Sequence, residues 1–134
     1  YKRQVEQARD RHLLVTPDGP RGPRHVIRPG LAYLASITGL PIVLIAVGYS
    51  RAWYLKTWDR MAIPRPWSTT YGVLSEPIYV APEIRPEDLG EICGRIERRF
   101  IQLTATAEQW AATGVRPERA DLTPAEPSAL PQCV

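Results

Sequence analysis

Cysteine and histidine are both scarce in this chain. Its 134 residues include two cysteines, Cys93 and Cys133, and two histidines, His12 and His25. Because the cysteines lie far apart and no short spacing of ligand residues occurs, we expect neither a disulfide framework nor a bound metal such as zinc. Cysteines that are not needed for disulfides suit a reducing compartment, so we place the protein in the cytoplasm.

A large excess of charge of one sign is also missing. The net charge is +3 at pH 7, and hydrophobic residues make up 44% of the chain, enough for the core of one domain. This mild positive charge suits a protein near anionic phosphates or lipid headgroups but is too weak to demand nucleic acid. The basic residues also lack the aromatic-studded strands of an RNA-binding sheet, so we expect no nucleic-acid partner.

A long uninterrupted hydrophobic run is absent as well. Residues 29–50 carry no charge, but Gly39-Leu40-Pro41 breaks this segment in the middle. Glycine is a good helix C-cap, and proline cannot continue a helix but is able to open a strand. We therefore predict a helix up to Thr38 and a strand from Ile42 to Val47, buried on both faces, in place of a membrane span.

Four further segments have the patterns of regular structure. We predict a short buried strand at 12–16, a strand at 68–74, a short strand or edge at 78–80 and a helix from Pro86 to about Trp110. In the strand at 68–74, residues 69, 71 and 73 share one face and residues 70, 72 and 74 the other. Together these elements predict an α/β fold, a layered domain with a mixed, partly parallel sheet flanked by helices.

The two ends of the chain differ from its middle. Residues 1–11 resemble the last turns of a helix, and the chain begins without a methionine. We therefore expect a domain truncated at its N-terminus, with residues 1–111 forming the C-terminal part of that domain. Residues 112–134 are rich in proline and charge and poor in apolar side chains, which predicts a disordered tail.

The run at 16–23, Thr-Pro-Asp-Gly-Pro-Arg-Gly-Pro, holds opposite charges in a stiff frame. It contains three prolines, two glycines, the carboxylate of Asp18 and the guanidinium of Arg21. Open α/β sheets usually bind ligands in loops at the carboxyl ends of their strands, so this run is a candidate ligand site. The alternative is a proline- and glycine-rich turn with a surface ion pair.

These motifs resemble the DUF374 branch of the lysophospholipid acyltransferase superfamily. The resemblance rests on the run at 16–23, on Arg-Pro-Gly at 28–30 and on Thr-Gly-Leu-Pro-Ile-Val at 38–43. Ser-Arg-Ala-Trp at 50–53, the tryptophan- and arginine-rich stretch up to residue 67, and the segment 71–78 complete it. It covers roughly residues 1 to 107 and implies an acyltransferase-like fold.

The resemblance also implies roles for individual residues. The superfamily's third block reads Phe-Pro-Glu-Gly-Thr-Arg, and its acid and arginine help to bind the polar head of the acyl acceptor. Those positions correspond here to Asp18, Gly19 and Arg21, with proline in place of the threonine. We expect these residues to bind substrate, with Arg24 and Arg28 as weaker candidates for the same anionic site.

The superfamily's catalytic pair, a histidine and an aspartate separated by four residues, is not present. Five positions after His12 stands Pro17, and five after His25 stands Gly30. In the family the histidine removes the proton of the acceptor hydroxyl and the carboxylate orients the imidazole. We therefore expect no catalytic residue in this chain and a catalytic motif upstream of it.

Three hypotheses for the function follow. The first is an acyltransferase that moves an acyl chain from coenzyme A or acyl-carrier protein, without another cofactor, to a lysophospholipid or lipid A-like acceptor. The second is an inactive remnant or pseudoenzyme that retains lipid or phosphate binding only. The third is an unrelated α/β domain with a phosphate-binding loop, against which the tryptophan- and arginine-rich stretch argues.

A lipid acceptor predicts contact with a membrane surface. Trp53, Tyr54, Trp58 and Trp67 have rings that prefer the headgroup boundary, and Arg51, Lys56, Arg60 and Arg65 lie in the same stretch. We expect peripheral attachment to the inner face of the cytoplasmic membrane through this stretch. The alternative is that these aromatic side chains pack into the domain's own core.

Overall fold

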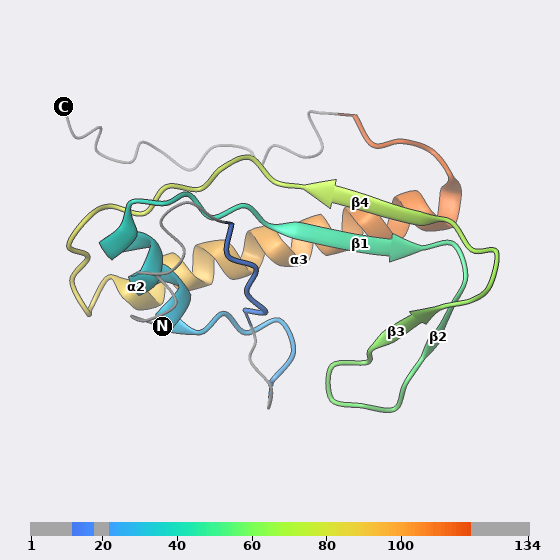
Figure 1. Cartoon of the computed structure of the whole chain (residues 1–134), viewed down its shortest axis with the longest axis horizontal. Helices are drawn as coiled ribbons and strands as arrows, with labels where there is room; N and C mark the ends of the chain where they lie inside the picture. The colour runs from blue at the N-terminus through green and yellow to red at the C-terminus, as the bar shows by residue number, and fades with distance from the viewer. Residues whose placement is uncertain (1–11, 18–21, 119–134) are drawn as a thin grey trace.

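Two helices and four strands lie in the part of the chain whose structure is described. The computed structural model describes residues 12–17 and 22–118. In chain order the elements are α2 (Pro29–Thr38), β1 (Ile45–Tyr49), β2 (Ala52–Tyr54), β3 (Ala62–Pro64), β4 (Thr70–Leu74) and α3 (Leu89–Thr113). Figure 1 shows α3 running alongside the β1–β4 pair, with the β2–β3 hairpin projecting beyond its end. The coarse prediction of an α/β fold is confirmed.

The strands form one long bent ribbon. β1 pairs with β4 in an antiparallel register from Ile45↔Leu74 to Tyr49↔Thr70, and β2 pairs with β3 in the same sense. An antiparallel bridge between Ile42 and Ile78 extends the ribbon at its other end. Every strand pairing within the described residues is antiparallel, so the expected parallel pairing is not found in this part of the chain.

Helix α2 follows the prediction closely. Pro29 is its first residue, where the missing N–H costs nothing, and it ends at Gly39. Gly39 has a left-handed backbone with φ of 68°, and its N–H donates a hydrogen bond of 2.9 Å to the Ala35 carbonyl. Neither helix in the described ranges is long and apolar enough to cross a membrane.

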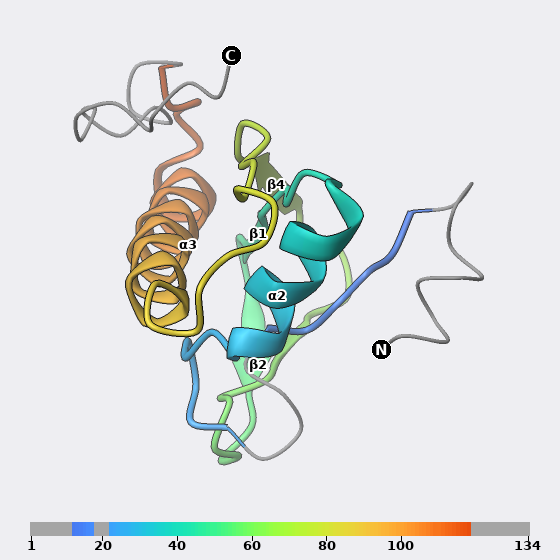
Figure 2. The same cartoon turned by 90° about the vertical axis from the view of Figure 1, so that its left-hand side faces the viewer.

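The segment from Ile42 to Val47 corrects one prediction. Ile42, Leu44 and Ala46 are buried, whereas the three residues that alternate with them, Val43, Ile45 and Val47, are exposed. The reason is that α3 covers one face of the β1–β4 pair, while no described element packs fully over the other face (Figure 2). The prediction of a strand buried on both faces was therefore wrong, and β1 begins only at Ile45.

The segment at 12–16 corrects a second prediction. It forms no strand, and Leu14 is 87% exposed. A strand needs a neighbouring strand to pair its backbone groups, and none of the described strands pairs with this segment. In β4, by contrast, the predicted faces are confirmed, since Val73 is buried and its neighbours Gly72 and Leu74 are exposed.

Helix α3 contributes four of the twelve buried side chains of the core cluster. It begins at Leu89, after a turn at 86–88, and so starts later than the prediction that placed Pro86 at its first turn. It ends at Gly114, so residues 112 and 113 belong to the helix and not to the predicted tail; residues 119–134 lie outside the described residues. Its buried side chains, at helical spacing, are Cys93, Ile96, Leu103, Ala107 and Ala111.

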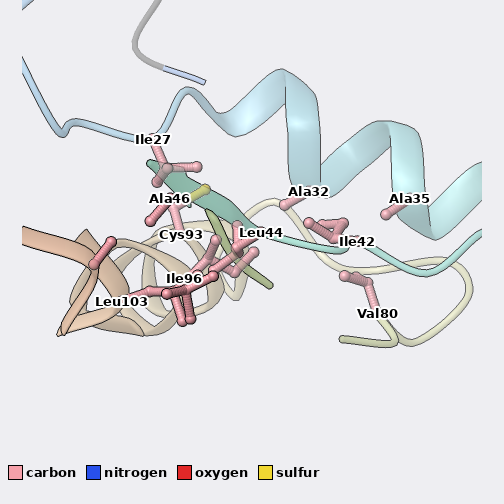
Figure 3. Close-up of a cluster of buried hydrophobic side chains, with 12 residues drawn as sticks. Ile27, Ala32, Ala35, Ile42, Leu44, Ala46, Val80, Cys93, Ile96 and Leu103 are labelled. Atoms are coloured by element: carbon pink, nitrogen blue, oxygen red, sulfur yellow. The ribbon is translucent and has the colours of Figure 1, made fainter. Parts of the chain in front are cut away.

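The core lies where α3, the ribbon and α2 meet. Figure 3 shows Ile96 and Leu103 of α3 facing Leu44 and Ala46 at the start of the ribbon. Ala32 and Ala35 of α2 lie toward Ile42 and Val80, in the same continuous cluster, as Figure 3 also shows. Helix α2 thus contributes two small buried side chains to this cluster, and it also packs against α3.

Helix α3 approaches the sheet closely at Gly48. A Cβ atom placed on this residue of β1 would overlap the carbonyl oxygen of Ala107 and press on the Ala111 side chain. Glycine is therefore required here for backbone-to-backbone packing, one of the recognised uses of glycine within a strand. Because β1 and α3 are fixed to each other at this point, the hairpin that continues β1 starts from a rigid base.

Candidate functional site

The predicted acceptor-binding residues fall partly outside the described part of the chain. Asp18, Gly19 and Arg21 lie outside it, while Arg24 is described and half-buried. The residues on either side of this stretch, Pro17 and Gly22, are also described. The described part of the site therefore consists of its two flanks and the elements that contact them.

Arg28 is hydrogen-bonded to both residues that flank the stretch 18–21, Pro17 and Gly22. Its backbone N–H donates a hydrogen bond of 3.1 Å to the carbonyl of Pro17. Its guanidinium Nη2 donates another of 2.6 Å to the carbonyl of Gly22. Because Arg28 is also the N-cap residue of α2, the helix start and the two flanks form one unit. The guanidinium that we considered as a weaker anion ligand is thus engaged with the backbone.

Gly22 lies directly against the tip of the β2–β3 hairpin. A Cβ atom built on Gly22 would overlap the six-membered ring of the Trp58 indole. Gly22 is buried and has a positive φ of 63°, a conformation that side chains other than glycine rarely adopt. Both the space and the backbone conformation therefore require glycine, and Trp58 packs on the backbone of the second flank.

A cluster of polar groups around Asp59 accompanies this packing. A hydrogen bond with the Thr57 side chain is the largest influence that lowers the pKa of Asp59 below its ordinary value of 3.8. The Met61 N–H, which donates to Asp59 Oδ1 at 3.3 Å, and the positive charge of Arg24 lower this pKa further. The positive charge of Arg24 therefore acts on a carboxylate of the hairpin.

The aromatic side chains expected to contact a membrane are open to solvent. The exposed fraction is 50% for Trp53, 60% for Tyr54, 45% for Trp58 and 96% for Trp67. None of these four rings belongs to the buried core cluster of the described residues. By contrast, Trp110 of α3, which was not proposed as a contact, is half-buried and packs on Tyr71 with 5.1 Å between ring centroids.

The hairpin side chains are held by local contacts. The Arg65 guanidinium lies over the Trp53 ring, 5.6 Å from its centroid, a cation–π arrangement. The Arg51 guanidinium donates a hydrogen bond of 3.3 Å to the carbonyl of Trp67, whose φ is 63°. These contacts place cationic groups beside exposed rings, as at a surface that meets both apolar and anionic groups.

The two histidines lie apart from any described carboxylate partner. His12 is exposed, and His25 packs its ring against Phe100 of α3 with 5.9 Å between centroids. Within the described residues His25 Nδ1 is buried and makes no hydrogen bond. This is the environment of a packing residue rather than of an oriented base. No group of three or more metal-ligating side chains gathers anywhere in the described ranges.

Sequence reasoning missed the two contacts that organise this site. The two contacts are the Arg28–Gly22 hydrogen bond and the Trp58–Gly22 packing. Neither the residue types nor their spacing in the sequence predicts that these residues touch. Gly22 between two charged and proline-rich stretches indicated a turn, but the partner on the hairpin could not be read from spacing. The available signal was the tryptophan at a hairpin tip, which is an unusual place for a large ring.

Comparisons with known proteins give one match. An uncharacterized protein of Rickettsia prowazekii (strain Madrid E) is 33% identical to this chain over 67 residues, which cover 50% of the chain and 31% of the relative. The chain thus spans about a third of the length of the curated relative it matches. No family model matches the sequence, and no solved structure matches it.

Proposed function

We propose that this chain is the C-terminal part of an acyltransferase of the DUF374 branch. In this proposal the complete enzyme transfers an acyl chain from coenzyme A or acyl-carrier protein to a lysophospholipid or lipid A-like acceptor. The acceptor oxygen forms a C–O bond to the acyl carbon, the C–S bond of the thioester breaks, and the hydroxyl proton passes through a base to the leaving thiolate. The base is the histidine of a His-X4-Asp motif expected upstream of Tyr1.

The residues of this chain bind and position the acceptor. Arg21 and Arg24 bind its anionic head, because a guanidinium donates two parallel hydrogen bonds to a phosphate. Asp18 orients Arg21 or accepts from acceptor hydroxyls, and Gly19 lets the backbone approach the ligand. One observation carries the proposal: the second flank of this loop, Gly22, packs on an exposed hairpin whose side chains suit a lipid surface.

The finer fold expectation belongs to this proposal. An acyltransferase-like, partly parallel sheet would arise if residues 12–16 paired with the edge of β1 that faces away from β4. Among the described residues that edge has no partner strand, and the apolar side chains of Leu13 and Leu14 are exposed. The connection from 12–16 through α2 to β1 has the order of a strand–helix–strand crossover, which normally joins parallel strands.

The experiment is an acyl-transfer assay on the full-length protein, with release of free coenzyme A thiol and lipid product both followed. We expect transfer by the parent protein, and a loss of acceptor affinity and turnover in Arg21→Ala. The matched control is Arg116→Ala, an exposed arginine beyond α3 that lies outside the proposed site. If Arg21→Ala leaves both KM and kcat for the acceptor unchanged, the binding role of this loop is rejected.

The same assay separates the enzyme from the alternative. An inactive remnant or pseudoenzyme would bind lipid or phosphate but show no transfer with any donor. Residues 1–134 alone are expected to give no transfer above a no-protein control, since only binding and positioning remain without a base. Transfer by this piece alone would contradict the proposal and would make His12 a candidate base.

A further inference from the structure

We propose that the β2–β3 hairpin docks the protein on an anionic lipid surface and that Trp58 links the docked hairpin to the segment Gly22–Arg28. This inference rests on the proposed function, because it names the surface at which the acceptor loop would meet its lipid. It also divides the hairpin's aromatic rings into two groups, those that face outward and the one that joins the hairpin to the body.

The outward group consists of rings and apolar side chains with little cover. Trp53, Tyr54 and Trp67 are exposed, as are Met61 and Ile63. The hairpin projects beyond the β1–β4 pair, and in Figure 1 no helix lies over it. Indole and phenol rings combine an apolar body with a polar N–H or O–H, which suits the headgroup boundary of a bilayer.

The charges on the hairpin indicate which kind of surface it binds. Between residues 51 and 67 the cationic side chains are Arg51, Lys56, Arg60 and Arg65, and the single carboxylate is Asp59. All four cations are exposed. Asp59 is hydrogen-bonded with Thr57 and Met61, and the charge of Arg24 acts on it as well. The outward surface is therefore cationic as well as aromatic, which favours a bilayer with anionic headgroups over an apolar protein face.

The linking group lies at the hairpin tip. Trp58 packs on the backbone of Gly22, and the charges of Asp59 and Arg24 attract each other across the same contact. Gly22 in turn is hydrogen-bonded to Arg28, the N-cap of α2. A hairpin held against lipid would thus restrain the segment 22–28 through contacts that already exist, without any rearrangement of the fold.

Vesicle binding of the full-length protein tests the docking step. We use vesicles of phosphatidylcholine with 30% phosphatidylglycerol, and vesicles of phosphatidylcholine alone, at low and high salt. We expect binding to the anionic vesicles, weakened by salt. Trp53→Ser with Trp67→Ser, and separately Lys56→Gln with Arg60→Gln, should each weaken it by roughly tenfold or more.

Matched controls lie elsewhere on the surface. Tyr79→Ser removes an exposed ring at the other end of the ribbon, and Arg116→Gln removes an exposed cation beyond α3. Both should change vesicle affinity by less than about twofold, as expected for isolated surface changes. Equal binding by the hairpin variants and the parent would overturn the proposal. So would a dimer in sedimentation that Trp67→Ser converts to monomer, since the occupant would then be a second copy.

Hydrogen exchange tests the link independently of activity. On binding anionic vesicles, exchange should slow at the hairpin amides of Leu55 and Arg65 and also at those of Val26 and Arg28, which are hydrogen-bonded in the fold. In Trp58→Ala the hairpin amides should still slow while those of Val26 and Arg28 do not. If all four slow equally in this variant, the link through Trp58 is wrong. This outcome does not depend on whether the protein transfers an acyl chain.

Discussion

Arg28 and Gly22 are joined by a hydrogen bond of 2.6 Å from the guanidinium Nη2 to the backbone carbonyl. Because the backbone N–H of Arg28 also binds the carbonyl of Pro17, one residue fixes both flanks of the predicted acceptor loop. The side chain that sequence reasoning treated as a weak anion ligand is therefore a structural tie between the loop and α2.

The first prediction concerns this tie. Arg28→Ala removes a charged donor from a backbone carbonyl and should lower the free energy of unfolding by about 1–2 kcal/mol. The control is Arg85→Ala, since Arg85 binds Glu87 and Asp88 in exposed ion pairs of 3.3 Å. Exposed pairs of this kind contribute about 0–1 kcal/mol. Urea unfolding of the full-length variants measures both, and equal losses would contradict the tie.

The second prediction concerns the approach of α3 to β1. Gly48→Ala puts a methyl group into the Ala107 carbonyl, which is backbone and cannot rotate away, so we expect a loss of about 1–3 kcal/mol. Gly72→Ala, in the neighbouring strand, meets no atom within 4 Å and should change stability by less than about 0.5 kcal/mol. Thermal and urea unfolding compare the two; the interpretation fails if Gly48→Ala is the milder change.

The third prediction concerns the hairpin tip. The hydrogen bond from Thr57 favours the charged form of Asp59, so Thr57→Val should raise the pKa of Asp59 toward its ordinary value of 3.8. Arg24→Gln should raise this pKa by less, because the Arg24 charge is a smaller influence. Carboxyl chemical shifts followed by NMR from pH 2 to 6 give both values.

The sign of the linkage follows from this direction. A carboxyl whose pKa is lower in the folded state stabilises the fold above its unfolded pKa, and that contribution is lost as the pH falls through the folded value. The charged form of Asp59 therefore contributes to folding stability at neutral pH, and this contribution is lost in acid. An Asp59 pKa that stays fixed in both variants would show that the tip contacts are absent in solution.

The fourth prediction concerns Cys93 in the core. Burial, and then the nearby charge of Glu97, raise the pKa of this thiol above its ordinary value of 9.0. The folded state thus disfavours the thiolate, so its contribution to stability is complete below pH 9.0 and is lost as the pH rises through the folded pKa. Urea midpoints between pH 8 and 10.5 should fall more steeply in the parent than in Cys93→Ala, both in a Cys133→Ser background. The same pH dependence of the urea midpoint in both proteins would contradict this prediction.

Local signals in the sequence predicted where helices and strands form more reliably than which of them pair or pack together. The Gly39-Leu40-Pro41 break, the spacing of Ile96 and Leu103, and the faces of β4 follow from backbone chemistry within a few residues, and each is confirmed. The strand expected at 12–16 failed because a strand depends on a pairing partner, which no local pattern specifies. Burial of Val43 and Val47 failed for the same reason, since hydrophobic composition does not tell which faces are covered.

The candidate site could be predicted only in part. The cationic and aromatic stretch was visible in the residues from Arg51 to Trp67, and the exposure of its rings agrees with a surface role. The contacts that connect this stretch to Gly22 are long-range and depend on how the ribbon bends after Tyr49. No pattern of charge or hydrophobicity encodes that bend.

The open side of the β1–β4 pair has a practical consequence for anyone who handles the protein. Val43, Ile45, Val47 and Leu74 present branched aliphatic side chains to water on the face opposite α3. Such a face is attractive to any other apolar surface, including its own copies. The edge of β1 that has no partner strand among the described residues adds a template for association. Preparations of residues 1–134 will therefore stay free of aggregates only over a narrow range of protein concentration. Replacement of Ile45 and Val47 by threonine, which keeps the β-branched shape, should widen that range without touching the core.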